Sequence, residues 1–156
     1  MKDSMRLFWG LAGRVWVGSV FCFAGYFKLM EPVENFRGVL AQYEILPYAG
    51  VSWIASGLPW LELIFGVFLI LGFAPRPSSL VLALLSLSFL VVLGISLALH
   101  KSVPLSCGCF GEGGIHLTVP QIFFLDLVDF LICLKIFPFK EYPWSLESLM
   151  RQSSED

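Results

Sequence analysis

Two cysteines, Cys107 and Cys109, flank a single glycine in the segment from Ser106 to Gly111. The glycine gives the backbone the freedom that a very small disulfide ring requires, and such a ring departs from relaxed disulfide geometry. Strained, exposed disulfides are the readily reduced and reactive ones. A structural bridge would more usefully join distant parts of the chain, where it constrains the unfolded state more. The pair therefore predicts thiol–disulfide exchange, with both cysteines as the catalytic residues.

Other uses of cysteine are alternatives to exchange. Two thiolates with His100 and His116 in the same segment could bind a metal. Cys-x-Cys is not the usual zinc spacing, however, and a soft ion such as monovalent copper would suit two thiolates better, so we assign no metal site. Inert free thiols are a third interpretation. The remaining cysteines, Cys22 and Cys133, fall at different depths and are predicted to be small buried residues that do not bond to each other.

Four charged residues stand inside long apolar stretches: Arg14, Glu62, Asp126 and Asp129. An ionisable side chain at the bilayer centre costs about 2.5 to 3.5 kcal/mol on insertion scales, so such residues normally face a partner inside a bundle. We expect the four to share one layer, with Arg14 paired to Glu62 or Asp129. The layer is either a buried ion pair that fixes helix register or a polar cavity that binds a quinone headgroup or relays protons.

Small residues indicate the faces on which these stretches would meet. In the first stretch they recur at four-residue spacing together with the arginine: Gly10, Arg14, Gly18 and Cys22. In the second stretch, Glu62 shares a helical face with Gly66. Because small side chains let two membrane helices approach closely, we expect these two faces to pack toward the centre of a bundle.

The composition indicates which elements must position these residues. The chain has 156 residues, of which 57% are hydrophobic and 14% charged, and its mean hydropathy is +0.80. These values exclude an ordinary soluble enzyme, and a net charge of −2 with scattered cations leaves no basic surface for nucleic acid. A helix needs about 20 apolar residues to cross a bilayer. Four stretches qualify: Leu7 to Met30, Ala49 to Ala74, Ser78 to Leu99 and Thr118 to Phe137.

We therefore predict an all-α polytopic membrane protein, an up-down bundle of four transmembrane helices over residues 6–137 with a short cytoplasmic tail over 138–156. Lysine and arginine gather in cytoplasmic segments of membrane proteins. With the N-terminus inside, the cytoplasmic side holds Lys2, Arg6, Arg76, Lys135, Lys140 and Arg151, and the outer side holds Lys28, Arg37 and Lys101. Both termini are thus predicted to be cytoplasmic, and the cysteine pair extracytoplasmic.

The first outer loop, from Glu31 to Pro47, has apolar residues at helical spacing between charged neighbours. This pattern predicts a short helix that lies on the membrane surface. Lys28 and Lys135 stand near the ends of their apolar stretches, where a lysine side chain can reach water. We expect both lysines to be structural.

Several of these residues form a pattern that resembles a known family. The pattern includes Arg14, the run from Ala24 to Lys28, Leu58-Pro59 with Glu62, and finally Cys107-Gly108-Cys109-Phe110-Gly111. It spans about Arg6 to Phe137 and resembles the MauE/DoxX family of small four-helix bacterial membrane proteins. The cysteine signature points to the MauE side of that family. The resemblance implies that Cys107 and Cys109 are a redox pair and that Arg14, Lys28 and Glu62 are the family's polar positions.

For MauE, the resemblance implies an accessory role, in which the protein helps a periplasmic, disulfide-rich dehydrogenase subunit to mature together with a thioredoxin-like partner. DoxX relatives are linked to redox systems of thiols, sulfur compounds and quinones. We therefore expect a thiol–disulfide oxidoreductase, or an accessory subunit of one, in the bacterial inner membrane. It would act with a thioredoxin-fold periplasmic protein on exported proteins, in either direction, with a quinone near Arg14, Glu62, Asp126 and Asp129.

The alternative function is a non-catalytic membrane scaffold, or a carrier of a soft metal on thiolates, that docks a partner through its outer loops. Reversible oxidation of the cysteine pair favours the first function, whereas stoichiometric binding of a soft metal favours the second. A homo-oligomer is compatible with both functions.

Overall fold

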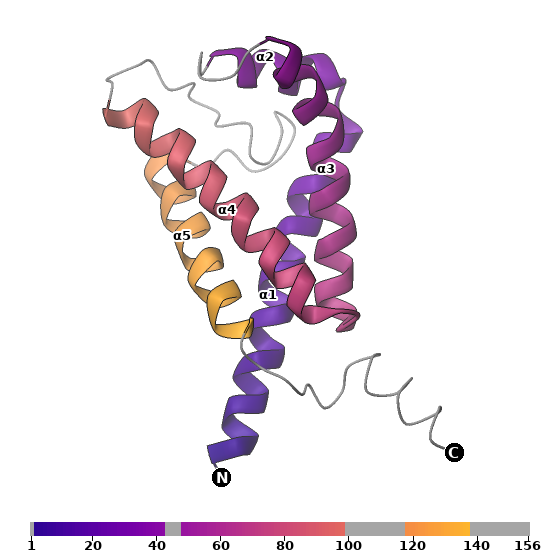
Figure 1. The fold of residues 1–156 in the computed structure, drawn as a ribbon, viewed down its shortest axis with the longest axis vertical. Coiled ribbons are helices and arrows are strands. Elements are labelled where there is room, and N and C mark those ends of the chain that lie inside the picture. Colours follow the sequence, from indigo (N-terminus) through magenta and orange to yellow (C-terminus); the bar gives the residue numbers. More distant parts are fainter. Residues whose placement is uncertain (1, 43–47, 99–117, 138–156) are drawn as a thin grey trace.

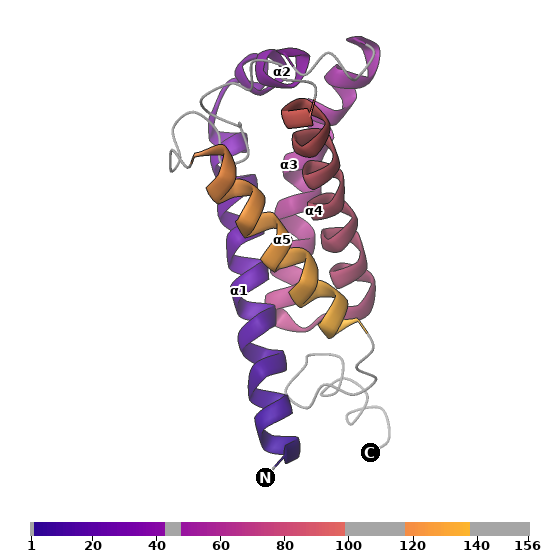
Figure 2. The ribbon, with the colours of Figure 1, turned by 90° about the vertical axis from the view of Figure 1, so that its left-hand side faces the viewer.

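Helices make up every element in the part of the chain that the structure describes. The computed structural model describes residues 2–42, 48–98 and 118–137. In chain order the helices are α1 (Lys2–Met30), α2 (Val33–Gln42), α3 (Tyr48–Leu71), α4 (Pro75–Ala98) and α5 (Val119–Ile136). The four longer helices pack together in alternating directions, and α2 lies across the end at which α1 and α4 finish (Figure 1, Figure 2). The all-α prediction is confirmed.

Three helices are long and apolar enough to cross a membrane: residues Phe8–Met30 of α1, Gly50–Leu71 of α3 and Pro75–Ile95 of α4. They correspond to the first three predicted spans. α5 corresponds to the fourth, but its 18 residues include three charged side chains, and it is not among the three. α2 falls in the segment predicted to hold a short helix, and its location on a membrane surface stays a prediction.

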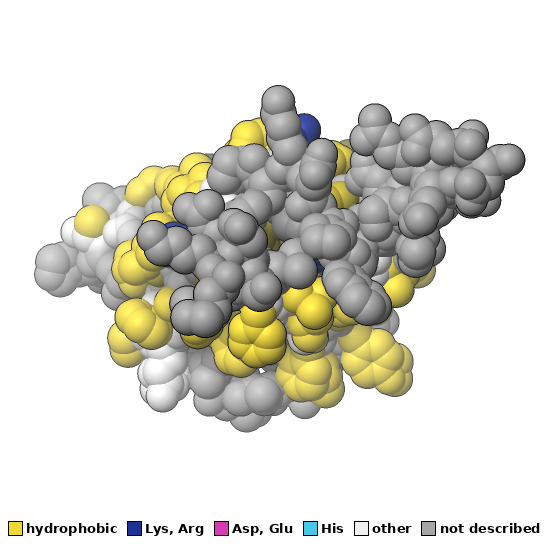
Figure 3. Space-filling view, turned by 90° about the horizontal axis from the view of Figure 1, so that it is seen from below, with side chains coloured by type: hydrophobic (Ala, Val, Ile, Leu, Met, Phe, Trp, Pro, Cys, Tyr) yellow, Lys and Arg dark blue, Asp and Glu magenta, His cyan; other side chains and the backbone are white. Residues whose placement is uncertain are grey.

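The surface of the long helices is largely apolar. Exposed large hydrophobic side chains occur on all four of them, for example Trp9, Trp53, Leu84 and Phe124. Trp53 is 82% exposed. Seen from the lower end, hydrophobic side chains cover much of the surface that the structure describes (Figure 3). Apolar side chains outside and charged side chains inside are the arrangement expected of helices surrounded by lipid.

A glycine sets the tight connection between α3 and α4. The N–H of Phe73 donates to the carbonyl of Phe68 (2.9 Å), and the N–H of Gly72 donates to that of Leu69 (3.3 Å). These two bonds form a Schellman motif, which requires a residue in the left-handed region, and Gly72 has a φ of 70°. Pro75 then begins α4, where the missing N–H of proline has no helical partner to lose.

The first turn of α5 is held by a side chain. The N–H of Thr118 donates to the side-chain carbonyl of Gln121 (2.9 Å), which satisfies a backbone donor at the helix start. Pro120 in the same turn favours a helix start for the same reason as Pro75. The segment between α4 and α5, residues 99–117, holds Cys107 and Cys109 and lies outside the described residues.

The buried hydrophobic residues form two clusters. The lower cluster contains Val17, Phe21, Leu69, Leu82, Ala83, Cys133 and Ile136. The upper cluster contains Ala24, Val39, Leu93 and Ile122. Each cluster draws residues from several helices, and the upper one includes a residue of α2. The buried polar side chains must therefore lie at levels of the bundle other than those of the two clusters.

Close contact between α1 and α3 depends on small residues. A Cβ built on Gly18 would lie 2.7 Å from the carbonyl oxygen of Gly66, and one on Gly66 would lie 2.8 Å from the sulfur of Cys22. A Cβ on Gly25 would lie 2.8 Å from the carbonyl oxygen of Pro59. The predicted small-residue face is thus confirmed at Gly18, Cys22 and Gly66. Gly10, in the same stripe, has nothing within 4 Å of such a Cβ.

Two alanine substitutions in α1 test this packing. Gly18→Ala is expected to lower the free energy of unfolding by about 1 to 3 kcal/mol, because the new methyl group must push the α3 backbone away. Gly10→Ala is the matched control in the same helix, and it should be neutral or stabilising by up to about 1 kcal/mol. Thermal unfolding of the full-length protein in detergent measures both, and equal midpoints for the two variants would contradict the close contact.

Candidate functional site

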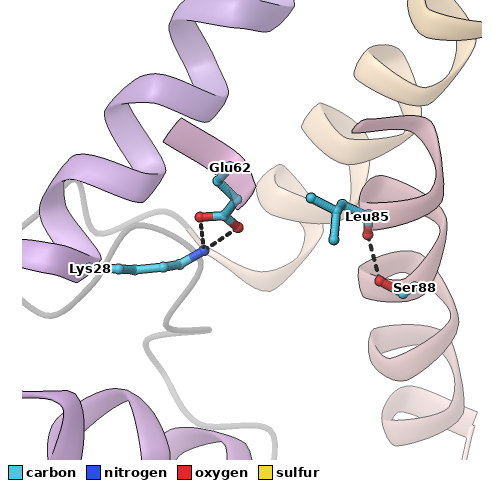
Figure 4. Close-up of polar contacts among 4 residues, drawn as sticks. All are labelled: Lys28, Glu62, Leu85 and Ser88. Atoms are coloured by element: carbon cyan, nitrogen blue, oxygen red, sulfur yellow. Dashed lines mark hydrogen bonds and ion pairs between the residues drawn. The ribbon is translucent and has the colours of Figure 1, made fainter. Parts of the chain in front are cut away.

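A buried ion pair joins α1 to α3. The ammonium of Lys28 donates to both carboxylate oxygens of Glu62, with Nζ to Oε1 at 2.6 Å and Nζ to Oε2 at 2.8 Å (Figure 4). Each side chain is only 1% exposed. Gly25, one turn before Lys28, allows the approach, since a Cβ there would lie 3.2 Å from the Cβ of Glu62. Both charges are thus withdrawn from solvent and depend on each other.

Two aromatic rings enclose the ammonium of Lys28. The ring centroid of Phe36 on α2 lies 5.2 Å from Nζ, and that of Phe89 on α4 lies 5.1 Å from it. Both distances are within the range in which a cation is attracted to an aromatic face. Side chains from four helices, α1 to α4, therefore meet at one charge. α2 contributes two buried apolar side chains, Phe36 and Val39, at this end of the bundle.

This arrangement corrects two predictions about charge. Lys28 does not reach water at the end of its span, because its ammonium is turned inward and bound by Glu62. Glu62 is consequently not the partner of Arg14. Residue type and spacing did not indicate Lys28 as a functional candidate, although the family resemblance included it among the polar positions.

Arg14 binds to the end of α3 instead. Its side chain is buried, and its Nε–H donates to the carbonyl of Leu69 (3.2 Å), in the last turn of that helix. The carbonyl of Leu69 also accepts the N–H of Gly72, and it belongs to the last turn, which carries the negative end of the helix dipole, so a guanidinium is stabilising there. Leu69 follows Glu62 by seven residues, about 10 Å along the helix axis. Arg14 therefore binds at a level different from that of Glu62.

Asp129 on α5 is fully buried and has a partner on α1. The indole N–H of Trp16 donates to its Oδ1 at 3.1 Å, so Trp16 takes the place that was predicted for Arg14. Asp126 is also buried, nearly one turn earlier on the same helix. α5 therefore turns two carboxyl groups inward, as the sequence predicts for charges in a membrane helix.

The two carboxyl groups of α5 lie between the two hydrophobic clusters. Along α5, both aspartates follow Ile122 of the upper cluster and precede Cys133 of the lower one. Along α4, Ser86 lies in the same way between Leu82 and Leu93, and it is fully buried.

Glu62 lies at another level, because it packs beside Gly25, whereas Asp129 is bound by Trp16, nine residues or about 13 Å earlier on α1. The prediction that the charges share one layer is therefore wrong for Glu62. We call Ser86, Asp126 and Asp129 the polar layer. Its carboxyl and hydroxyl groups can bind a polar ligand or pass protons, which an apolar interior cannot do.

The serines of α4 were not singled out from the sequence. Ser78, Ser79 and Ser86 are all fully buried. Ser86 follows Ser78 by eight residues and Ser79 by seven, and this helical repeat puts the three serines on one face. A serine among leucines has no hydropathy signal strong enough to show this, so only the repeat could have indicated the buried face.

The predicted catalytic residues, Cys107 and Cys109, lie outside the described residues, as do His100 and His116. Cys22 and Cys133 lie inside them, and both are free thiols as predicted. Cys133 is fully buried, as predicted, whereas Cys22 is only half-buried. Within residues 2–42, 48–98 and 118–137, no three histidine, cysteine or acidic side chains are grouped so that they could hold a metal ion.

Comparison with known proteins identifies the group to which this fold and site belong. The model of the family described as methylamine utilisation protein MauE matches residues 6–137. The chain belongs to the MauE family. With three helices able to cross a bilayer, this membership identifies a membrane protein. Lys28, Glu62, Arg14 and the two aspartates all fall within the matched region.

A relative of known sequence supports the family. The methylamine utilization protein MauE of Paracoccus denitrificans is 31% identical to this chain over 105 residues, which make up 67% of this chain and 54% of the relative. The chain thus spans about half the length of that relative. No match to a solved structure was found.

The Lys28–Glu62 pair can be tested by removing one charge or both. Lys28→Met leaves a buried carboxyl without its counter-ion and is expected to lower the free energy of unfolding by about 3 to 5 kcal/mol. The double variant Lys28→Met/Glu62→Leu should recover most of this loss, because no charge then remains buried. Unfolding in detergent measures both. Lys135→Met, at an exposed lysine of α5, is the control and should change stability by less than about 0.5 kcal/mol. A double variant no more stable than the single one would contradict a paired role.

Proposed function

We propose that this protein is a four-helix transmembrane protein of the bacterial inner membrane that takes part in thiol–disulfide exchange through Cys107 and Cys109. Its partner would be a periplasmic protein of thioredoxin fold, and its role the maturation of exported proteins. The observation that carries the proposal is the Cys-Gly-Cys pair in a chain of the MauE family. The segment that contains the pair joins the end of α4 to the start of α5.

The burial of its charges supports α5 as the fourth membrane span. Asp126 and Asp129 are buried in the bundle, whereas Phe124, Leu131 and Leu134 are exposed on the outer side of the helix. Lipid would therefore meet an apolar surface, although the composition of α5 is less apolar than that of the other spans. α5 also packs along α4 in the opposite direction, which matches an up-down bundle (Figure 2).

The distribution of cations supports a cytoplasmic N-terminus. One end of the molecule holds the start of α1, the first turn of α4 with Arg76 and the last turn of α5 with Lys135 (Figure 1). The opposite end carries α2, and Lys28 near that end is taken up by an ion pair inside the bundle. Because cations favour the cytoplasmic side, the end that carries α2 would face the periplasm, together with the segment that holds the cysteines.

The exchange transfers two electrons and two protons in each cycle. In the oxidising direction, a thiolate of the partner attacks the Cys107–Cys109 disulfide, one bridge cysteine leaves as a thiolate, and a mixed disulfide forms. The second thiolate of the partner then attacks the partner's other sulfur atom, which is held in the mixed disulfide. The partner leaves with a disulfide, and Cys107 and Cys109 are left as two thiols. The reducing direction is the same sequence reversed.

A quinone is the cofactor that we propose for the polar layer. When bound, it supplies an acceptor for two electrons and two protons, which balances the oxidation of two thiols. The residues fit a ring that carries oxygen atoms, because Oδ2 of Asp129 and Oγ of Ser86 are buried and have no hydrogen-bond partner among the described residues. Asp126 would provide further polar surroundings. Arg14, bound to the end of α3, and Glu62, bound by Lys28, lie outside this set.

Thiol trapping across defined redox buffers tests the exchange. The purified protein should show one reversible two-electron couple that is lost in Cys107→Ser and in Cys109→Ser, because each cysteine needs the other to form the bridge. Cys22→Ser and Cys133→Ser are the matched controls and should leave the couple unchanged, since these thiols are free and lie within α1 and α5. Thiols that stay reduced in every buffer would favour the scaffold, and stoichiometric binding of a soft metal would favour the carrier.

The proposed orientation is tested by labelling in spheroplasts. A membrane-impermeant maleimide added outside should modify Cys107 and Cys109 after reduction, and it should modify neither in inside-out vesicles. The variant Cys107→Ser/Cys109→Ser keeps only Cys22 and Cys133 and should stay unlabelled on both sides, because Cys133 is fully buried and Cys22 lies well inside α1. Labelling from the cytoplasmic side alone would reverse the orientation.

A further inference from the structure

Two buried polar atoms of the polar layer lack hydrogen-bond partners. Oδ2 of Asp129 and Oγ of Ser86 are both inaccessible, and neither bonds to any residue that the structure describes. Two other serines of α4 satisfy their hydroxyl groups locally: Ser79 donates to the carbonyl of Arg76 (2.9 Å) and Ser88 to that of Leu85 (2.7 Å; Figure 4). The hydroxyl of Ser78, in the first turn of the helix, also has no partner among the described residues. An unpaired polar atom in an apolar interior is unfavourable by about 1 to 3 kcal/mol. Such atoms indicate a missing partner.

Asp129 and Ser86 lie at the same level of the bundle. α4 and α5 run in opposite directions (Figure 1). Leu82 and Cys133 belong to the same cluster, and Ser86 follows Leu82 by four residues, just as Asp129 precedes Cys133 by four. At a rise of about 1.5 Å per residue, both polar residues are about 6 Å above that shared cluster. The two residues therefore lie at one level of α4 and α5.

Trp16 lies between this layer and the surroundings of the bundle. Its side chain is 52% exposed, while its indole N–H donates to Oδ1 of Asp129. Tryptophan is usually found at the ends of membrane spans, but Trp16 stands eight residues inside the span that begins at Phe8. An indole at that depth needs a buried acceptor for its N–H, and Asp129 provides one. The same indole covers Asp129 on the side from which a lipid-soluble molecule would approach.

We propose that Asp129 and Ser86 hold the headgroup of a quinone or quinol, which enters from the lipid past Trp16. The hydroxyl of Ser86 donates to a ring oxygen in either oxidation state. Oδ2 of Asp129 accepts a hydrogen bond from a ring hydroxyl, which only the reduced form has, so the site prefers the quinol. The choice of ligand rests on the proposed function, but the binding itself does not need Cys107 or Cys109.

Fluorescence of Trp16 tests this site. Full-length protein with Cys107→Ser and Cys109→Ser is placed in lipid nanodiscs, and Phe replaces every tryptophan except Trp16. The probe is decylubiquinone, whose ring quenches indole emission. A second variant that keeps only Trp53, exposed on α3, reports quenching by probe that is merely dissolved in the lipid. As decylubiquinone is added, the quenching of Trp16 should saturate, whereas the quenching of Trp53 should rise linearly. Decylubiquinol added under anaerobic conditions should reverse the quenching of Trp16 at about one tenth of the quinone concentration.

Substitutions identify the atoms that bind. Ser86→Ala should raise the half-saturating concentration of both forms by several-fold to about tenfold, whereas Ser79→Ala, at a buried serine with its own backbone bond, should not. Asp129→Asn keeps the acceptor for Trp16 and should remove the preference for the quinol. Quenching that rises linearly at Trp16 would overturn the proposal. So would quenching that saturates in Ser86→Ala and in Asp129→Asn at the same concentrations as in the protein that keeps Ser86 and Asp129.

Two controls keep the outcomes separate. Unfolding midpoints show whether each variant is folded, and if Asp129→Asn is not, Ser86→Ala against Ser79→Ala decides the question alone. The thiol couple is measured independently on the protein with all four cysteines. A couple without saturable quenching rejects this site and leaves the exchange intact, whereas saturable quenching without a couple rejects the exchange and leaves the site intact.

Discussion

The buried ion pair between Lys28 and Glu62 is the interaction on which the other contacts depend. Neither charge has access to water, and leaving one of them unpaired costs about 3 to 5 kcal/mol. The pair forms only where the backbones of α1 and α3 come close, which Gly25 permits. The ammonium is further enclosed by rings of α2 and α4. One pair of charges thus ties together four of the five helices in the part of the chain that the structure describes.

The buried polar side chains are satisfied on one side of the bundle and unsatisfied on the other. On the side of α1 and α3, each carboxylate oxygen of Glu62 has a donor. On the side of α4 and α5, Asp129 uses one oxygen for Trp16, while its other oxygen and the hydroxyl of Ser86 have no partner among the described residues. A layer that served only to fix helix register would be expected to satisfy all its polar atoms, because unpaired ones are destabilising. The unsatisfied side is therefore where a ligand would bind.

Hydropathy predicts the helices of this protein well, because an apolar run of about 20 residues has few other uses. It also predicts that Arg14, Glu62 and the two aspartates turn inward, since their charges are unfavourable toward lipid. The pairing of these charges could not be predicted in the same way. Which of them meet depends on the crossing of α1 with α3 and on the long side chain of Lys28, which can turn inward to Glu62 as easily as outward to water. Ser86 gives almost no signal in the sequence because its role depends entirely on the level at which α4 faces α5.

The number of thiols limits how this chain could move electrons. One pair, Cys107 and Cys109, can hold a single disulfide and therefore two electrons, so each pair of electrons must leave before the next arrives. The other two thiols do not provide a relay: Cys22 on α1 donates to the carbonyl of Leu63 (3.8 Å), and Cys133 is enclosed in the lower cluster on α5. In the proposed exchange, an acceptor or donor would consequently come to the pair from outside the chain. A lipid-soluble carrier of two electrons would meet that requirement, and we propose that the unpaired buried oxygen atoms of Ser86 and Asp129 bind one.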